Sequence, residues 1–394
     1  MKLAFALYKY FPFGGLQRDF LRIAAACHEK NCKIRVYTFD WKGVLPPWIE
    51  LCLVPKKGLT SQSGNKRFTD WMMQHRRRHP VDALIGFNKM PGLDIYYAAD
   101  GCYLSRSYDL HGRLYRLSGR HKHFAHYEQA VFGIDSKTEI LMISEQQKPV
   151  FESYYRTQCH RFHMLPPGIA RERIMPGNSE QVRREFRNEF GISGEDRLLL
   201  MVGSGFKTKG VDRTIMALSS LPREFYERTR LFVVGQDNSA GILKQARKLR
   251  VHDRFHVFPG RDDVSRFMQG ADIFIHPARH ENTGTVLLEA IVAGLPVLTT
   301  AVCGYARYVI DARMGIVLAE PFRQERLNRA LLEMMSADDE QKVRWRENGK
   351  KFSQAADIYS MPEVAARMIV SIVGRLHAQT IPVLPTSMPV LSEL

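Results

Sequence analysis

The segment DIFIHPARHENTGTVLLEAIVAGLPVLTT, residues 272–300, says most about the fold. The apolar run IFIHP precedes a polar stretch, and TVLLEAIVAG then has the pattern of a short helix that ends at Gly294. We expect Thr283 or Thr285 to cap the N-terminus of this helix. PVLTT follows as a second apolar run. A strand, a helix and another strand in this order indicate a parallel sheet covered by helices.

The same alternation extends through most of the chain. The apolar runs before residue 167 are LAFAL, IRVYT, ALIGF, DIYYAAD and EILMIS; those after it are LLLMVG, LFVVG, FHVFPG, DIFIHP, PVLTT and GIVLA. Because the pattern restarts after LPPGI, we expect an α/β protein with two doubly wound, Rossmann-like domains, residues 1–166 and 167–357. Ligands are expected in the cleft at the carboxyl ends of their strands.

Composition and charge limit the function classes. The 394 residues, 45% of them hydrophobic and 25% charged, fit a soluble globular protein with two cores. A net charge of +16 favours anionic partners, namely nucleic acid, an anionic membrane or a phosphorylated substrate. The six cysteines have no metal-binding spacing, which predicts free thiols in a reducing cytoplasm. No apolar run is long enough to cross a membrane, and the N-terminus is interpreted as a strand rather than a signal peptide.

Glu281 and Glu289 form the first candidate site, with Gly284 between them. At ~1.5 Å per residue, a helix would separate them by roughly 12 Å, close to the distance between the hexose and the ribose of a nucleotide-sugar. The N–H groups of a helix N-terminus would then face the diphosphate. One carboxylate could hold sugar hydroxyls and the other the ribose diol. Two solvated helix carboxylates are the alternative interpretation.

A glycine-rich turn from Gly203 to Gly210 follows a predicted strand and carries Lys207 and Lys209. It matches neither GxGxxG nor a P-loop, but its lysines suit a departing diphosphate. Ordinary surface lysines are the alternative.

The first predicted strand ends in a second such turn, Gly14-Gly15, followed by Asp19. Its backbone could approach an anion closely, although a structural turn and an aspartate that complements the helix dipole explain it equally well. Asp100 ends another predicted strand, where it would face the cleft or simply form a turn. His276 is expected to be a structural histidine with satisfied hydrogen bonds.

Residues 103–131 are rich in cations, namely Arg106, Arg113, Arg116, Arg120 and Lys122. We expect Arg113, Arg116 and Arg120 to share one face of a helix and the leucines at 110, 114 and 117 to share another. A basic amphipathic segment of this kind suits adsorption to an anionic bilayer. A solvated helix face is the alternative.

Several of these stretches together point to a family. LYKYFPFGGLQRDF, GFNKMPGLD, LPPGI, VVGQD, HPARHENTGTVLLEA and GLPVLTTAVCGYA give the chain a resemblance that extends over nearly its whole length. The chain resembles the retaining GT-B glycosyltransferases, and more closely the lipopolysaccharide core glucosyltransferase family. The resemblance implies transfer of a hexose, glucose above all, from a UDP-sugar to the inner-core heptose of lipopolysaccharide, without a metal or other cofactor. It also implies a helix at 358–378 that returns to the first domain, and peripheral attachment to the cytoplasmic face of the inner membrane.

The resemblance also assigns residues. It implies that Glu281 faces the donor hexose and Glu289 the ribose. The catalytic group would be Lys209, Glu281, Asp100 and Asp19, with Asp100 near the acceptor hydroxyl. Donor contacts would come from Gly14, Gly15, Arg173, Lys207, Arg261, Asn282, Thr283, Gly284, Thr285, Val286 and Glu289.

Two departures from the family pattern matter. Ser204-Gly205-Phe206 stands where many members have an arginine, so the diphosphate would depend on the nearby lysines and Arg173. Asn282-Thr283 is polar where small apolar residues are expected, which keeps an N-acetylhexosamine donor open.

Other classes of protein remain as alternatives. A sugar-nucleotide epimerase or a phosphorylase could share this architecture, whereas the missing GxGxxG disfavours a dehydrogenase. A polyanion- or nucleic-acid-binding protein without transferase activity would explain the charge, but no recognition motif supports it, and a phosphate-bearing lipid acceptor explains the charge equally well.

Overall fold

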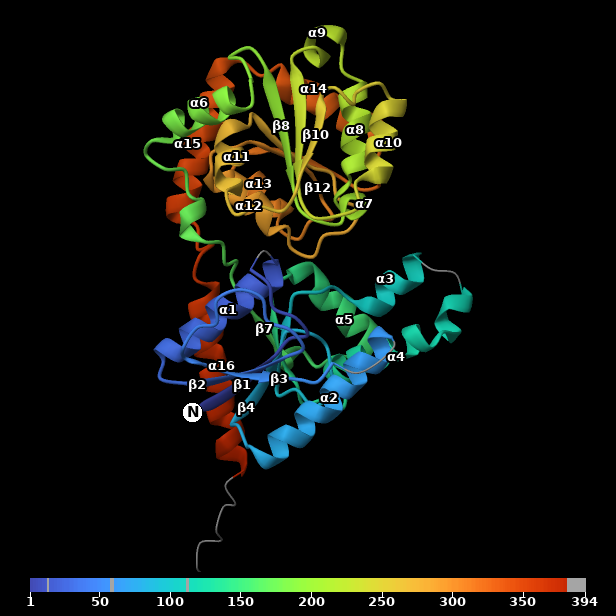
Figure 1. Cartoon of the computed structure of the whole chain (residues 1–394), viewed down its shortest axis with the longest axis vertical. Helices are drawn as coiled ribbons and strands as arrows, with labels where there is room; N and C mark the ends of the chain where they lie inside the picture. Colours follow the sequence, from blue (N-terminus) through green and yellow to red (C-terminus); the bar gives the residue numbers. More distant parts are fainter. Residues whose placement is uncertain (13, 57–59, 111–112, 381–394) are drawn as a thin grey trace, which may run out of the picture.

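The computed structural model describes residues 1–12, 14–56, 60–110 and 113–380. They form two parallel sheets with helices on both faces, one above the other along the long axis of the molecule (Figure 1). The α/β architecture predicted from the alternating pattern is therefore confirmed.

The first sheet has the strand order β3-β2-β1-β4-β5-β6-β7, and every neighbouring pair is parallel. Its strands are β1 (Lys2–Ala6), β2 (Lys33–Thr38), β3 (Ile49–Leu53), β4 (Ala83–Gly86), β5 (Ile95–Ala98), β6 (Glu139–Met142) and β7 (Phe162–Met164). The second sheet has the order β10-β9-β8-β11-β12-β13, also parallel. Its strands are β8 (Arg197–Val202), β9 (Thr229–Val234), β10 (Phe255–Phe258), β11 (Ile273–His276), β12 (Val297–Thr300) and β13 (Gly315–Leu318).

Helices connect the strands. Those among the first-sheet strands are α1 (Gly15–Glu29), α2 (Ser61–Arg78), α3 (Tyr103–Leu110), α4 (Gly119–Phe132) and α5 (Lys148–Tyr155), with 3-10 turns η1 (Arg113–Leu117), η2 (Glu145–Gln147) and η3 (Cys159–Arg161). The rest are η4 (Arg171–Arg173), α6 (Ser179–Glu189), α7 (Phe206–Lys209), α8 (Val211–Ser219), α9 (Arg223–Tyr226), α10 (Ala240–Lys248), α11 (Val264–Gly270), α12 (Thr285–Val292), α13 (Ala306–Asp311), α14 (Gln324–Met335), α15 (Asp339–Ala355) and α16 (Met361–Thr380).

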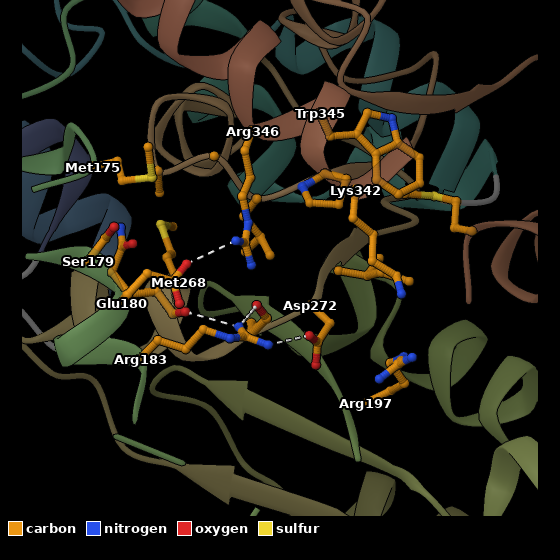
Figure 2. Close-up of a pocket in the computed structure, with 18 of the residues that line it drawn as sticks. Met175, Ser179, Glu180, Arg183, Arg197, Met268, Asp272, Lys342, Trp345 and Arg346 are labelled. Atoms are coloured by element: carbon orange, nitrogen blue, oxygen red, sulfur yellow. Dashed lines mark hydrogen bonds and ion pairs between the residues drawn. The ribbon is translucent and has the colours of Figure 1, made fainter. Parts of the chain in front are cut away.

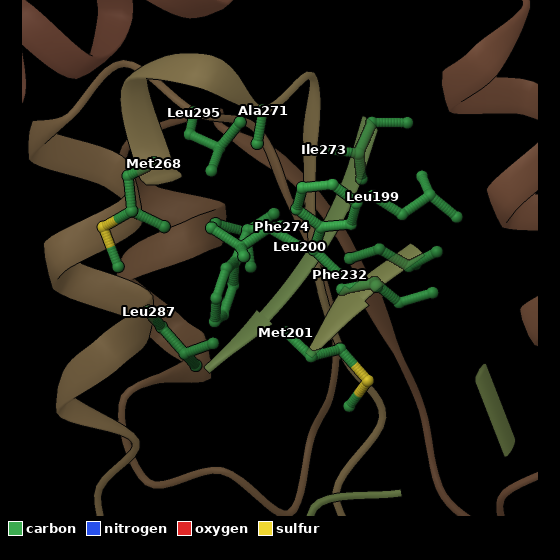
Figure 3. Packing of buried hydrophobic residues seen from close by; sticks show 14 of the residues in the cluster. Leu199, Leu200, Met201, Phe232, Met268, Ala271, Ile273, Phe274, Leu287 and Leu295 are labelled. Atoms are coloured by element: carbon green, nitrogen blue, oxygen red, sulfur yellow. The ribbon is translucent and has the colours of Figure 1, made fainter. Parts of the chain in front are cut away.

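The central strands are apolar throughout because helices cover both faces of each sheet. In β8 and β11, Leu199, Leu200, Ile273 and Phe274 are all buried, and Leu287 of α12 packs into the same core (Figure 3). This packing fixes α12 against the sheet, with its first residue close to the carboxyl end of β11.

The sequence pattern missed the two edge strands of the first sheet. β3 has the sequence IELCL, in which Glu50 pairs with Arg35 of the neighbouring strand, and β7 is only FHM. An edge strand has one paired side and needs no continuous apolar run, so its sequence carries a weaker signal.

The last helix, α16, lies against α1 and the first sheet, although it follows the second sheet in the chain (Figure 1). Ala365, Ile369 and Val373 are buried in one cluster with Leu3 and Phe5 of β1. The core around the first sheet therefore includes the end of the chain.

Candidate active site

A cleft of about 950 Å³ lies where the carboxyl ends of the two sheets face each other. Tyr8 and Asp100, which follow β1 and β5, line one side of it. Lys209 of α7 and Glu281, which follows β11, line the other. This is where open parallel sheets bind their ligands.

Two side chains hold Glu281 in the cleft wall, Lys209 of α7 and His276 at the end of β11. Its carboxylate pairs with the Lys209 ammonium and lies 3.2 Å from Nε2 of His276. Burial raises the pKa of Glu281, but the His276 hydrogen bond and the Lys209 charge outweigh it and bring the pKa down to about 2. Glu281 is therefore ionised at neutral pH and can accept hydrogen bonds from hydroxyl groups.

His276 differs from the expectation of a satisfied structural histidine. Its ring is fully buried, and its Nε2 lies within hydrogen-bond distance of the Glu281 carboxylate. Nδ1 is buried and has no hydrogen-bond partner among the described residues. His276 thus orients the Glu281 carboxylate through its Nε2 atom.

Neither threonine caps α12, contrary to expectation. The N-cap is Gly284 with φ 80°, and among the described residues no side chain accepts a hydrogen bond from the first turn. A Cβ at this glycine would lie 3.2 Å from Cγ of Glu281, which adds a steric reason for glycine. N–H groups at a helix N-terminus that lack a side-chain cap suit an anion.

Glu289 lies inside α12 and is buried, whereas Glu281 lies on the loop before it. A single helical rise between the two glutamates was therefore the wrong description. Glu289 lies 3.7 Å from Nε of Arg173 and 3.9 Å from Arg18 of α1. Arg173, expected at the diphosphate, is thus bound to the predicted ribose carboxylate, and also donates to Ser265 at 3.0 Å.

The two lysines of the glycine-rich turn have different surroundings. Lys209 lines the cleft and pairs with Glu281, whereas the side chain of Lys207 is exposed. Arg279, which the sequence did not single out, lines the cleft and binds Asp212 through both guanidinium nitrogens at 2.7 Å.

Asp19 of α1 lies beside the first sheet and accepts a hydrogen bond of 2.8 Å from the Tyr97 hydroxyl. Burial raises the pKa of Asp19 to about 6, although Tyr97 and the nearby Arg22 oppose the shift. Gly14 is the N-cap of α1 and Gly15 its first residue, with no side-chain cap.

Arg261 has its guanidinium occupied. It donates to both carboxylate oxygens of Asp263 at 2.6 and 2.9 Å and lies over the Phe267 ring at 4.7 Å. Its side chain is therefore committed to Asp263 and Phe267.

The basic segment is not one helix. It consists of α3, η1 and α4, so the predicted arginine face does not exist as a continuous stripe. Arg116 lies 3.9 Å from the centre of the Tyr108 ring, and Arg120 is 5.4 Å from that of Phe124. Lys122 is exposed on α4, and the side chains of Leu110 and Arg113 lie outside the described residues.

Leu114 and Leu117 are 83% and 70% exposed, so the apolar side of the basic segment faces outward. Polar and cationic residues around exposed leucines are the surface that an interfacial helix presents. Among the helices that the structure describes, none is long and apolar enough to cross a membrane.

Further cleft residues have no donor or catalytic role in the sequence interpretation, which places Arg106 only in the basic segment. Lys89, in the GFNKMPGLD motif, lines the cleft together with Tyr103 and Arg106 of α3. The motif was a usable signal for Lys89, but nothing local showed that α3 faces Glu281.

A second pocket of about 420 Å³ lies at the opposite end of the second sheet (Figure 2). Its walls are closed by ion pairs of their own, Arg183 with Asp272 at 2.5 Å and Arg346 with Glu180 at 2.9 Å. It contains no predicted site residue, which leaves the cleft as the candidate active site. Within the described part of the chain, no group of three or more His, Cys, Asp or Glu side chains could hold a metal ion.

Comparison with known proteins supports the resemblance to glycosyltransferases that the sequence indicates. The family described as "Glycosyl transferases group 1" matches residues 182–352. The lipopolysaccharide glucosyltransferase WaaG of Escherichia coli K12 is 47% identical over 369 residues, covering 94% of this chain and 98% of that protein. The crystal structure of WaaG superposes with a TM-score of 0.89 over 93% of this chain and 99% of that one. Anabaena HepE in complex with UDP-glucose shares only the fold, at 16% identity and a TM-score of 0.71 over 94% of this chain and all of that one.

Proposed function

Because the chain belongs to the lipopolysaccharide glucosyltransferase family of GT-B glycosyltransferases, we propose that it moves glucose from UDP-glucose to the inner-core heptose of lipopolysaccharide. The observation that best supports this proposal is the Glu281–Lys209 pair in the cleft, close in sequence to the N-terminus of α12, which has no side-chain cap. A carboxylate for sugar hydroxyls and two positive features for a diphosphate are what a nucleotide-sugar requires. Among the described residues of the other pocket, no such combination recurs.

Lys209 and the first turn of α12 act on the leaving group. As the bond between the anomeric carbon and the diphosphate oxygen breaks, negative charge grows on UDP, and preorganised positive groups stabilise it. Lys209 is already positioned by Glu281, so little reorganisation is needed. These groups supply the charge stabilisation without a metal ion.

We assign retention of anomeric configuration to front-face transfer. The acceptor oxygen bonds to the anomeric carbon on the face that UDP leaves, and a departing diphosphate oxygen takes the acceptor proton. Asp100, exposed at the end of β5 and lining the cleft, lies on the acceptor side. Glu289 with Arg173 and Arg18 forms the ribose end of the donor site, and Asp19 lies behind it.

The enzyme acts at the cytoplasmic face of an anionic inner membrane in this proposal. The support is the outward position of Leu114 and Leu117 beside Arg116, Arg120 and Lys122. A lipid-linked acceptor would lie in the same surface.

An N-acetylhexosamine donor is the second candidate, and Asn282 favours it. Its side-chain N–H₂ donates to the Ala99 carbonyl at 2.5 Å, which fixes the orientation of the amide. Oδ1 is then buried and has no hydrogen-bond partner among the described residues, although Asn282 lines the cleft next to Glu281. An unpaired buried acceptor is costly, and an acetamido N–H is a group that could satisfy it.

Calorimetric titration with UDP, UDP-glucose, UDP-N-acetylglucosamine and UDP-N-acetylgalactosamine, with and without EDTA, tests the donor assignment. We expect binding that survives EDTA, with UDP-glucose as the sugar form that supports transfer. Preference for an N-acetylated donor, lost in Asn282→Ala, would select the second candidate. If the protein bound neither UDP nor any UDP-sugar, the transferase proposal would be refuted and the polyanion-binding alternative favoured.

Glu289→Ala tests the ribose end of the site. Loss of a charged hydrogen-bond acceptor predicts UDP binding about tenfold weaker or more. Glu340→Ala, at an exposed glutamate of α15, is the matched control and should leave UDP binding unchanged. Equal affinities for both variants would remove the ribose assignment.

A further inference from the structure

The wall of the cleft opposite Glu281 has no part in the donor assignments. It is made by the first turns of α3 and by α4, through Tyr103, Ser105, Arg106 and Phe124. With the donor on the second-sheet side, this wall is left for the acceptor.

The cations of the cleft are not equally available to a ligand. Four lysines and arginines line it: Lys89, Arg106, Lys209 and Arg279. Three are neutralised by carboxylates of the chain, Lys89 by Glu128, Lys209 by Glu281 and Arg279 by Asp212. Arg106 is exposed, and its side chain makes no hydrogen bond or ion pair with the residues that the structure describes.

The backbone that carries Arg106 is firmly held. Glu128 of α4, fully buried, accepts hydrogen bonds from the backbone N–H groups of Tyr103 and Leu104 at 2.8 and 3.1 Å. It also binds Lys89 at 2.5 Å, and Lys89 in turn donates to the Gly101 carbonyl at 2.8 Å. The first turn of α3 is thus preorganised, which lowers the cost of ligand recognition by a side chain on it.

The position of α3 connects this wall to the outer surface. Arg106 lies toward the cleft end, whereas Tyr108, near the other end of α3, is exposed and stacks with Arg116 beside the outward-facing Leu114 and Leu117. A lipid-linked saccharide lying on that surface would reach the cleft along α3.

We propose that Arg106 binds a phosphate group carried by the acceptor saccharide, next to the hydroxyl that is glycosylated. This inference rests on the proposed function for the identity of the acceptor. The planar guanidinium offers two parallel N–H donors to phosphate oxygens, and among the side chains that the structure describes no carboxylate pairs with it. Arg106 is therefore a specificity residue for a phosphorylated acceptor.

The test uses a delipidated, phosphorylated core oligosaccharide and the same oligosaccharide after removal of its phosphates, each titrated calorimetrically into the full-length protein. We expect Arg106→Gln to weaken binding of the phosphorylated form about tenfold or more, and to leave the dephosphorylated form unaffected. Arg329→Gln, an exposed arginine of α14, is the control. An equal loss for both oligosaccharides, or no loss for either, overturns the proposal.

A second arm separates an acceptor phosphate from lipid headgroups. In transfer assays with the lipid-linked acceptor, Arg106→Gln should raise the acceptor KM equally in neutral detergent and on anionic vesicles, with the UDP-sugar KM unchanged. An effect confined to anionic vesicles would assign Arg106 to the bilayer and overturn the proposal. UDP titration of the variant reports the donor site separately, so failure of the transferase proposal is distinguishable.

Discussion

Glu281 lines the cleft and Asp19 lies in α1, and the pKa values of these two carboxylates move in opposite directions. Burial acts on both, but Glu281 has a hydrogen bond from His276 and the charge of Lys209 to outweigh it. The Tyr97 hydrogen bond and the charges of Arg22 and Arg18 act against burial at Asp19 but do not outweigh it, and its pKa rises to about 6. The balance between burial and these interactions sets the direction of each shift in pKa.

The raised pKa of Asp19 predicts a pH-dependent stability. The folded state binds the Asp19 proton more tightly than the unfolded chain, so this stabilisation is complete below pH about 3.8 and is lost as pH rises through about 6. A shift of this size is at most about 3 kcal/mol. In Asp19→Asn this component should disappear, and the urea midpoint should fall less than in the wild type between about pH 4 and pH 7.

The measurement is urea unfolding at several pH values in that window. Asp311→Asn, at an exposed aspartate of α13, is the matched control and should follow the wild type. If Asp19→Asn and wild type gave parallel curves, Asp19 would be ionised in the folded protein throughout this range.

At the scale of elements, the basic segment shows how local chemistry breaks a helical pattern. Ser118 accepts a hydrogen bond of 3.1 Å from the His121 N–H and begins α4 as its N-cap. A cap starts a new helix, so the arginines on either side of Ser118 cannot share one continuous helical face. The side chains of Arg116 and Arg120 lie over separate aromatic rings instead.

Replacing Arg116 and Arg120 together by glutamine should weaken binding to anionic vesicles. Each arginine near an anionic surface contributes about 1 kcal/mol, so the pair predicts a loss of about 30-fold. Vesicle sedimentation measures this, with UDP titration expected to be unchanged. The exposed pair Arg326 and Arg329 of α14, changed in the same way, is the control, and an equal response to both pairs would refute a specific role for the basic segment.

At the scale of the whole molecule, the chain crosses between its two sheets and returns. Asn282 of the second-sheet side binds the Ala99 carbonyl beyond β5, and Arg307 of α13 pairs with Glu145. The returning helix α16 then completes the core around the first sheet. We propose domain limits of 1–166 with 358–378, and 167–357, on this basis.

Ile369→Ala tests the contribution of α16. Ile369 is fully buried against the first-sheet core, and truncating such a side chain costs about 2–5 kcal/mol. Calorimetric unfolding should show a lower transition for the part of the protein around the first sheet, with UDP still stabilising the other part. Ile310→Ala, 62% exposed on α13, should change little. A uniform shift of one transition would argue against two separately folding parts.

Much of the site was predictable from local sequence because its parts are local. Glu281, Gly284 and Glu289 come from one loop and helix, and Lys209 comes from one glycine-rich turn. Strand–helix alternation likewise predicted the α/β fold, since covered parallel strands must be apolar. The edge strands escaped this reasoning because only one of their sides is paired.

The sequence by itself determined the two-sheet α/β class and the family, and it singled out the loop and helix that carry Glu281 and Glu289 as the candidate donor site. Only the tertiary structure decided that Lys89 and Arg106 face Glu281, that Arg173 binds Glu289, and that α16 belongs to the first core. The physical reason is the sequence distance over which the two kinds of interaction act. Periodicity and turn chemistry act between residues a few positions apart, whereas the cleft joins groups more than a hundred residues apart through the packing of sheets and helices.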